Sequence, residues 1–200
     1  MTDATQSLSR AALAQLFTDA RTHMHWQDRP VTAAQLREIY ELAKWGPTSM
    51  NGFPLRLKFV VSAAAKDTLV PLLAEGNQAK TRAAPATIIV ASDPAFHEQL
   101  PTLFPGAPAA KDMFAANAAL RDSTAFRNSS LQAAYLIMAV RALGLDAGPM
   151  SGFDAAKVDA AFFADSGYRT NMLINIGYGV PEKLYPRGPR PAFDEVAEIL

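Results

Sequence analysis

The chain has 200 residues, 19 basic and 19 acidic side chains, and no cysteine. The net charge of zero argues against the basic surface that nucleic acids and anionic membranes attract, so we expect neither as a partner. The lack of cysteine excludes disulfides, thiolate nucleophiles and thiolate metal sites. Half of the residues are hydrophobic, which at this length predicts one domain over residues 1–200. The first ten residues lack a signal-peptide pattern, so we expect a cytoplasmic protein.

Helix signals dominate the first quarter of the chain. Ser9 is a candidate N-cap for a first helix. Thr32 and Gln35 form a capping-box pattern ahead of a second, amphipathic helix, which should stop at Gly46. The proline-bounded loop that follows, 47–54, carries hydroxyls and an amide. These groups suit hydrogen bonding to a heteroaromatic edge, and they suit an ordinary turn equally well.

Between those two helices lies the segment RTHMHW, residues 21–26, with two of the chain's three histidines. His23 and His25 stand beside Arg21, and arginine with histidine supplies donors and charge for a phosphate. A metal site is another interpretation, although the segment contains no acidic residue to complete a ligand set. A polar exit from the first helix explains the same residues without any ligand.

The middle of the chain predicts two strands. Residues 55–62 alternate before turning apolar, and 86–91 form an unbroken apolar run typical of a fully buried strand. Between them we expect a helix over 66–74, bent or shortened by Pro71, and then a loop or helix end over 75–81.

The longest helical pattern lies further on and is apolar nearly all round, which is typical of a helix buried in a core. It is too short to span a bilayer and carries Gln132 and Arg141. We expect Ser129 or Ser130 to cap its start and Gly144 to end it in the left-handed conformation. The other elements expected are a helix over 96–104, partial helix over 105–127, a helix capped by Asp154 and a strand over 171–178.

Two segments show neither the hydrophobic periodicity of a helix nor that of a strand. Residues 146–153 combine two glycines and a proline with bulky apolar side chains. They form either a tight connecting loop or a stretch whose backbone N–H groups face a flat ring. The tail 179–200 is rich in proline and carries three positive charges, as expected of a segment that wraps around a second subunit. Helices and strands are mixed without strict alternation, which favours an α+β fold. No GxGxxG or P-loop pattern is present.

In their order and spacing, four segments resemble those of the nitroreductase family of flavin enzymes: RTHMHW, GPTSMN, GNQAK and GPMSGFD. The resemblance covers nearly the whole chain. Within the family, the chain is most similar to the subgroup of malonic semialdehyde reductases in bacterial pyrimidine degradation, through the segments TAFRNSS, QAAYLI and NMLINIGYG. The resemblance implies a nitroreductase-like α+β fold, in which helices flank a mainly antiparallel central sheet and include a long core helix. It also implies a homodimer that exchanges the C-terminal arm, about residues 180–200.

The resemblance further implies one FMN at each of two subunit interfaces, with NADPH or NADH as hydride donor. The cofactor contacts that it implies are Arg21, Thr22, His23, His25, Met50, Asn51, Asn77, Lys80, Pro149, Met150, Ser151, Gly152, Arg187 and Arg190. In that set, Arg21 and Arg187, with Arg190 as the other candidate, would bind the phosphate. Lys80 would stabilise the negative charge of the reduced flavin. A backbone N–H of 149–152 would reach flavin N5.

The reaction implied is a ping-pong hydride transfer through flavin N5 that reduces malonic semialdehyde to 3-hydroxypropionate. The substrate carboxylate calls for a cation, and His25, Arg121 and Arg127 are the candidates. One alternative is an NAD(P)H nitro, quinone or enal reductase with loose acceptor choice. Another, from a different class, is a flavin-binding dimer without turnover. No residue pattern identifies the proton donor or chooses between NADPH and NADH.

Overall fold

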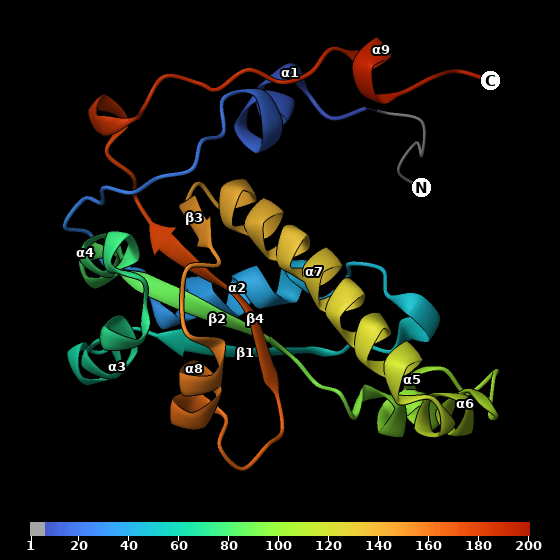
Figure 1. Cartoon of the computed structure of the whole chain (residues 1–200). Helices are drawn as coiled ribbons and strands as arrows, with labels where there is room; N and C mark the ends of the chain where they lie inside the picture. Colours follow the sequence, from blue (N-terminus) through green and yellow to red (C-terminus); the bar gives the residue numbers. More distant parts are fainter. Residues whose placement is uncertain (1–6) are drawn as a thin grey trace.

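The computed structural model describes residues 7–200; residues 1–6, on which the signal-peptide expectation partly rests, lie outside the described residues. A four-stranded sheet forms the centre, in the order β1-β2-β4-β3 (Figure 1). Its strands are β1 (Leu55–Val60), β2 (Ala86–Ser92), β3 (Asp146–Met150) and β4 (Arg169–Gly177). Every neighbouring pair is antiparallel, which confirms the predicted α+β class and its antiparallel sheet.

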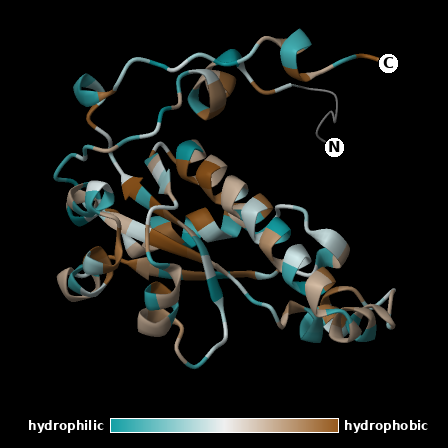
Figure 2. Ribbon diagram, viewed as in Figure 1, coloured by the Kyte–Doolittle hydropathy of each residue, from teal (hydrophilic) through white to brown (hydrophobic). Residues whose placement is uncertain are grey.

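One face of the sheet is covered by α2 (Ala33–Ala43) and the long helix α7 (Ala118–Ala142). Ile88 and Val90 of β2 point into this layer and are fully buried. Side chains alternate between the faces of a strand, so Ile89 points to the opposite side. Figure 2 shows the hydrophobic colour concentrated on the strands and on the helix surfaces that face them.

The opposite face carries shorter elements. They are α3 (Ala63–Leu69), the 3₁₀ turn η3 (Val70–Leu72), α4 (Glu75–Ala83) and α8 (Ala155–Phe162). Leu69, Leu73 and Val158 join Ile89 in a second apolar cluster. Asp154 caps α8 by accepting from the Lys157 N–H at 3.2 Å, as predicted. The segment expected to be a loop or helix end at 75–81 is the body of α4.

The long helix begins twelve or thirteen residues before the predicted start. Asn117 caps α7 and accepts from the Leu120 N–H at 3.0 Å, so the expectation of a cap at Ser129 or Ser130 was wrong. Both serines lie inside the helix, and their hydroxyls donate to the Phe126 carbonyl at 3.0 and 2.9 Å. A serine can bond to a carbonyl of the preceding turn and so sit within a helix. The predicted end is confirmed, because Gly144 has φ +71°.

A small helical cluster packs on the first half of α7. It consists of η4 (Phe96–Gln99), α5 (Leu100–Leu103) and α6 (Ala110–Ala116), which confirms helix over 96–104 and partial helix over 105–127. Phe96 and Phe114 stack edge to face with ring centroids 5.0 Å apart, and both are buried.

The N-terminal helix and the C-terminal arm lie together outside the sheet (Figure 1). Ser9 caps α1 (Arg10–Leu13) as predicted, and a π-helical turn, η1 (Ala14–Thr18), follows. The arm contains η5 (Pro181–Lys183) and α9 (Phe193–Val196). Arg187 donates to the carbonyls of Thr18 and Ala20 at 2.7 and 3.1 Å, which ties the arm to the N-terminal segment. Among residues 7–200, no helix is both long enough and apolar enough to cross a bilayer.

Candidate functional site

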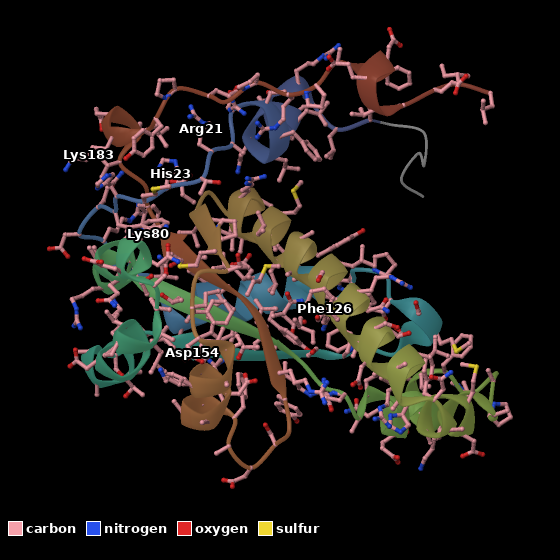
Figure 3. The ribbon with its side chains drawn as sticks, viewed as in Figure 1. Arg21, His23, Lys80, Phe126, Asp154 and Lys183 are labelled. Atoms are coloured by element: carbon pink, nitrogen blue, oxygen red, sulfur yellow. The ribbon has the colours of Figure 1, made fainter. Side chains whose placement is uncertain are left out.

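Residues 22–27 run along the open edge of β3 and the end of β4. The His23 N–H donates to the Ala147 carbonyl at 3.2 Å, and the Gln27 N–H donates to the Tyr178 carbonyl at 2.8 Å. The His25 carbonyl in turn accepts from the Val180 N–H at 3.1 Å. These bonds fix Arg21 and the start of the arm at the same end of the sheet, as Figure 3 shows for Arg21, His23 and Lys183.

Four arginines meet in a pocket of about 270 Å³ at this end of the molecule. They are Arg21, Arg141, Arg187 and Arg190, and we call this the arginine pocket. Arg21 also donates to the Tyr185 carbonyl of the arm. No carboxylate is among the described residues that line the pocket. Such a gathering of guanidiniums suits a phosphate, which accepts forked, charge-assisted hydrogen bonds.

Arg141 is the member of the pocket that sequence reasoning did not select. It lies in the last turn of α7 and donates to the Leu16 carbonyl at 3.1 Å. Its Nε is buried and has no hydrogen-bond partner among residues 7–200, which leaves a donor free for a ligand. Burial lowers the pKa of Arg141; Asp146 opposes this effect and Arg187 adds to it. An arginine at a helix C-terminus is common for reasons of the helix dipole, so its presence there does not specifically indicate an anion site.

His23 turns away from the arginine pocket. Its imidazole is buried, and Nε2 lies 3.3 Å from Oδ1 of Asp146. It packs so closely on Gly179 that a Cβ there would overlap the ring. Burial lowers the pKa of His23, Asp146 opposes this, and Arg21 lowers it further. The ring therefore packs this segment onto the sheet, and its predicted contact with the cofactor stays a prediction.

The other predicted residues of the first segment remain near the surface. Thr22 is exposed and lines the arginine pocket. His25 is exposed and engages the fold through its carbonyl. Within residues 7–200, no three histidine, aspartate or glutamate side chains gather as a ligand set for a metal.

A second group of predicted residues is joined through α4. The Asn77 amide donates to the Gly152 carbonyl at 2.8 Å, and the Thr81 hydroxyl lies 3.6 Å from the sulfur of Met150. The Lys80 carbonyl accepts from the Trp26 indole N–H at 3.1 Å. The structure thus brings Asn77 and Lys80 together with the end of β3. None of the ion pairs among residues 7–200 involves the Lys80 ammonium.

Residues 146–150 form a strand, so the expectation of a loop there was wrong. β3 pairs with β4 on one side only, and the Ala147 carbonyl bonds outward to His23. In an antiparallel strand alternate residues share this orientation, so Pro149 also turns its backbone outward, and Ser151 follows the end of the strand. A proline is tolerated there because its missing N–H faces no partner strand. The Ser151 N–H has no acceptor among residues 7–200 and is available to a ligand.

Met50 and Asn51 lie elsewhere on the subunit. They belong to η2 (Ser49–Asn51), where φ is +52° at Met50 and +49° at Asn51. The Asn51 amide donates to the Leu103 carbonyl at 2.9 Å, and the Ser49 N–H donates to Asn128 of α7 at 2.8 Å. The single chain therefore does not bring this loop to the arginine pocket, which lies at the other end of α7.

Comparison with known proteins identifies the family of the chain. The model of the nitroreductase family matches residues 18–178. A Burkholderia lata protein, provisionally named NADH dehydrogenase/NAD(P)H nitroreductase, is 61% identical over 96% of this chain and 98% of its own length. A protein of the same provisional name from Xanthomonas oryzae is 58% identical over the same shares.

A nitroreductase structure from Exiguobacterium sibiricum, solved with FMN and also provisionally named, shares the fold. Its TM-score is 0.86 at 24% identity, over 98% of this chain and 99% of that one. The family match over most of the chain and the close relatives establish that this protein belongs to the nitroreductase family.

Proposed function

We propose that this protein is an FMN-dependent NAD(P)H oxidoreductase. The arginine pocket is the observation that carries the proposal, because four guanidiniums without a carboxylate fit a phosphate monoester of nearly two negative charges. The free Nε of Arg141 is one donor for it. The FMN in the Exiguobacterium structure and the NAD(P)H in the name of the Burkholderia relative support the choice of cofactors.

FMN, when bound, supplies the reversible acceptance and donation of a hydride. The chain's own groups bind and orient it. Arg21, Arg141 and Arg187 would hold the phosphate. The Lys80 ammonium would place positive charge near the flavin ring and favour its reduced form. The Ser151 N–H would supply a donor just beyond the end of β3.

We also propose a homodimer of single-domain subunits spanning residues 1–200. Its contact surface would be the outer face of α7 and the arm, about residues 180–200. Leu131 and Tyr135 of α7 are 45% and 42% exposed, and Ile199 of the arm is 87% exposed. Exposed apolar side chains gathered in this way are typical of surfaces that another subunit covers. A dimer would also let Met50 and Asn51 reach the flavin of the partner.

Reduction of malonic semialdehyde to 3-hydroxypropionate is the specific reaction we propose. The hydride from NADPH or NADH would end on the carbonyl carbon, and the resulting alkoxide would take a proton from water. Support for this acceptor comes from the similarity of the segments TAFRNSS and NMLINIGYG to the malonic semialdehyde reductase subgroup. A general NAD(P)H nitroreductase is the second candidate, because the two close relatives carry that name.

A spectroscopic titration tests the proposal. Protein loaded with FMN and washed should keep the visible flavin bands, and anaerobic NADPH or NADH should bleach them. Adding malonic semialdehyde should restore the bands, whereas faster recovery with a nitroaromatic would favour the second candidate. Retained flavin that neither nicotinamide bleaches would indicate a binding protein without turnover. Failure to retain flavin would refute the proposal as a whole.

A further inference from the structure

The outer face of α7, which we propose as part of the subunit contact, carries in the single chain an open groove of about 540 Å³ that a partner subunit would border. Its lining residues are Ser123, Phe126, Arg127, Ser130, Leu131 and Ala134. They recur every three or four positions, so they share one stripe of the helix. Phe126 of α7 is 60% exposed (Figure 3). With Leu131 it forms the apolar wall of the groove.

Arg127 is the one charged residue in this lining. No ion pair or side-chain hydrogen bond among residues 7–200 engages its guanidinium. The two hydroxyls of the groove are already engaged: Ser123 donates to the Leu120 carbonyl at 3.0 Å, and Ser130 donates to the Phe126 carbonyl at 2.9 Å. A free fork of N–H donors between apolar walls suits the carboxylate of a small organic acid.

The other two candidate cations have different surroundings. Arg121 lies beside an acid, with Nε 3.6 Å from Oδ1 of Asp122, and the other oxygen of that carboxylate bonds Arg169 at 2.9 Å. His25 lies on the segment bonded to Val180, at the far end of the sheet. Arg127 alone of the three combines a groove with freedom from an acidic partner in the described structure.

Asn128, the next residue in the sequence, is buried and does not line the groove, but its side chain holds the predicted flavin loop. It accepts from the Ser49 N–H at 2.8 Å and donates to the Ser49 hydroxyl at 3.3 Å. Ser49 opens η2, whose Met50 and Asn51 would touch the flavin in the proposed dimer. Arg127 is therefore one residue from the side chain that anchors this loop.

We infer that Arg127 binds the carboxylate of the acceptor at the flavin site, and so selects short carbonyl acids over neutral carbonyl compounds. The inference rests on the proposed FMN-dependent function. Arg127 takes no part in bond making or breaking; it is a specificity-determining residue. Its charge and fork hold one end of the acid, while Phe126 contacts the carbon chain.

The test compares malonic semialdehyde with propanal, which has a methyl group in place of the carboxylate. Holoenzyme is assayed as wild type, R127Q, R127K and the matched control R121Q on the same helix. In R127Q the ratio of kcat/KM for the acid to that for propanal should fall about 10- to 100-fold, mainly through KM. R127K should fall less, and R121Q should keep the wild-type ratio. Calorimetry with 3-hydroxypropionate should show weaker binding to R127Q by a similar factor.

The outcomes separate this inference from the proposed function. An unchanged ratio in R127Q, with flavin still bleached by NADPH or NADH, overturns the role of Arg127 alone. Conversion of R127Q to a monomer, with both acceptors reduced equally poorly, would mark the groove as a subunit contact only and also overturns it. A wild type that is never bleached refutes the proposed function, and 3-hydroxypropionate binding then still reports on Arg127.

Discussion

Asn175 of β4 donates its side-chain amide to the hydroxyl of Thr81 on α4 at 3.0 Å, deep inside the protein. Its amide oxygen accepts from the Thr87 hydroxyl at 2.7 Å, and all three residues are at most 1% exposed. The Thr81 hydroxyl also contacts the Met150 sulfur at 3.6 Å. This buried chain fixes α4, which carries Lys80, relative to the end of β3.

Asn175→Ala should therefore destabilise the fold strongly. It leaves the buried Thr87 hydroxyl without its acceptor and the Thr81 hydroxyl with only the Met150 sulfur, and we expect the free energy of unfolding to fall by about 2–4 kcal/mol. Urea denaturation with an unchanged m-value would measure this. Asn171→Ala is the control, because that side chain is only part-buried, although its amide bonds the buried Ser129 as well as Ser130. Equal losses in both variants would contradict the argument.

Gly179→Ala tests the packing of His23. A Cβ at Gly179 would overlap the imidazole, and that ring is buried and lies 3.3 Å from Asp146, so it has little room to move. We expect a loss of about 1–3 kcal/mol in the free energy of unfolding, as for other overpacked sites. Gly106→Ala should change little, since a Cβ there meets nothing within 4 Å. A variant at Gly179 as stable as the one at Gly106 would show that His23 is not confined.

The stability of the protein should also depend on His23 through pH. Burial lowers its pKa below the ordinary value of 6.5. Below that pH the unfolded chain binds more protons at this position than the folded chain, so stability present above pH 6.5 is lost as the pH falls toward the folded pKa. Wild type should lose up to about 1.4 kcal/mol per pH unit more than His23→Gln over this window. Parallel pH profiles of the two unfolding free energies would rule out the effect.

Arg141→Gln tests the arginine pocket. The variant removes one cation and the buried free Nε, so the Kd for FMN should rise about 10- to 100-fold. Quenching of flavin fluorescence on binding would give the Kd. Arg37→Gln, on the exposed side of α2, is the matched control and should bind FMN like wild type. An unchanged Kd in Arg141→Gln would place the phosphate elsewhere.

Local signals predicted much of the fold. The Ser9 cap, the capping box of Thr32 and Gln35, and the left-handed Gly144 each depend on neighbours within a few residues, and the structure has all three. The predicted start of α7 was wrong because a serine can either cap a helix or bond back to a carbonyl within one. Which of the two occurs depends on what packs around the serine. Strand β3 was not predicted because it forms by pairing with β4, which lies at a distance in the sequence.

The sequence selected individual residues of the candidate site but did not predict which of them lie together in the fold. The resemblance selected Arg21 and Arg187, and the structure brings them into one pocket. It could not select Arg141, since only the packing of the end of α7 on the segment near Leu16 takes that side chain there. The inward turn of His23 likewise depends on Asp146, 123 positions later in the chain.

The arginine pocket also has a consequence for the order of folding. Arg21 meets Tyr185 across 164 positions, and Arg187 meets Thr18 across 169. Contacts between residues so distant in sequence form slowly. The long chain segment between them must first close into a loop, which costs conformational entropy before the contacts can stabilise it. The sheet and α7 can assemble first, and the arm docks afterwards. Capture of an anion that spans both segments would then be the step that fastens the arm, so ligand and folded chain would stabilise each other.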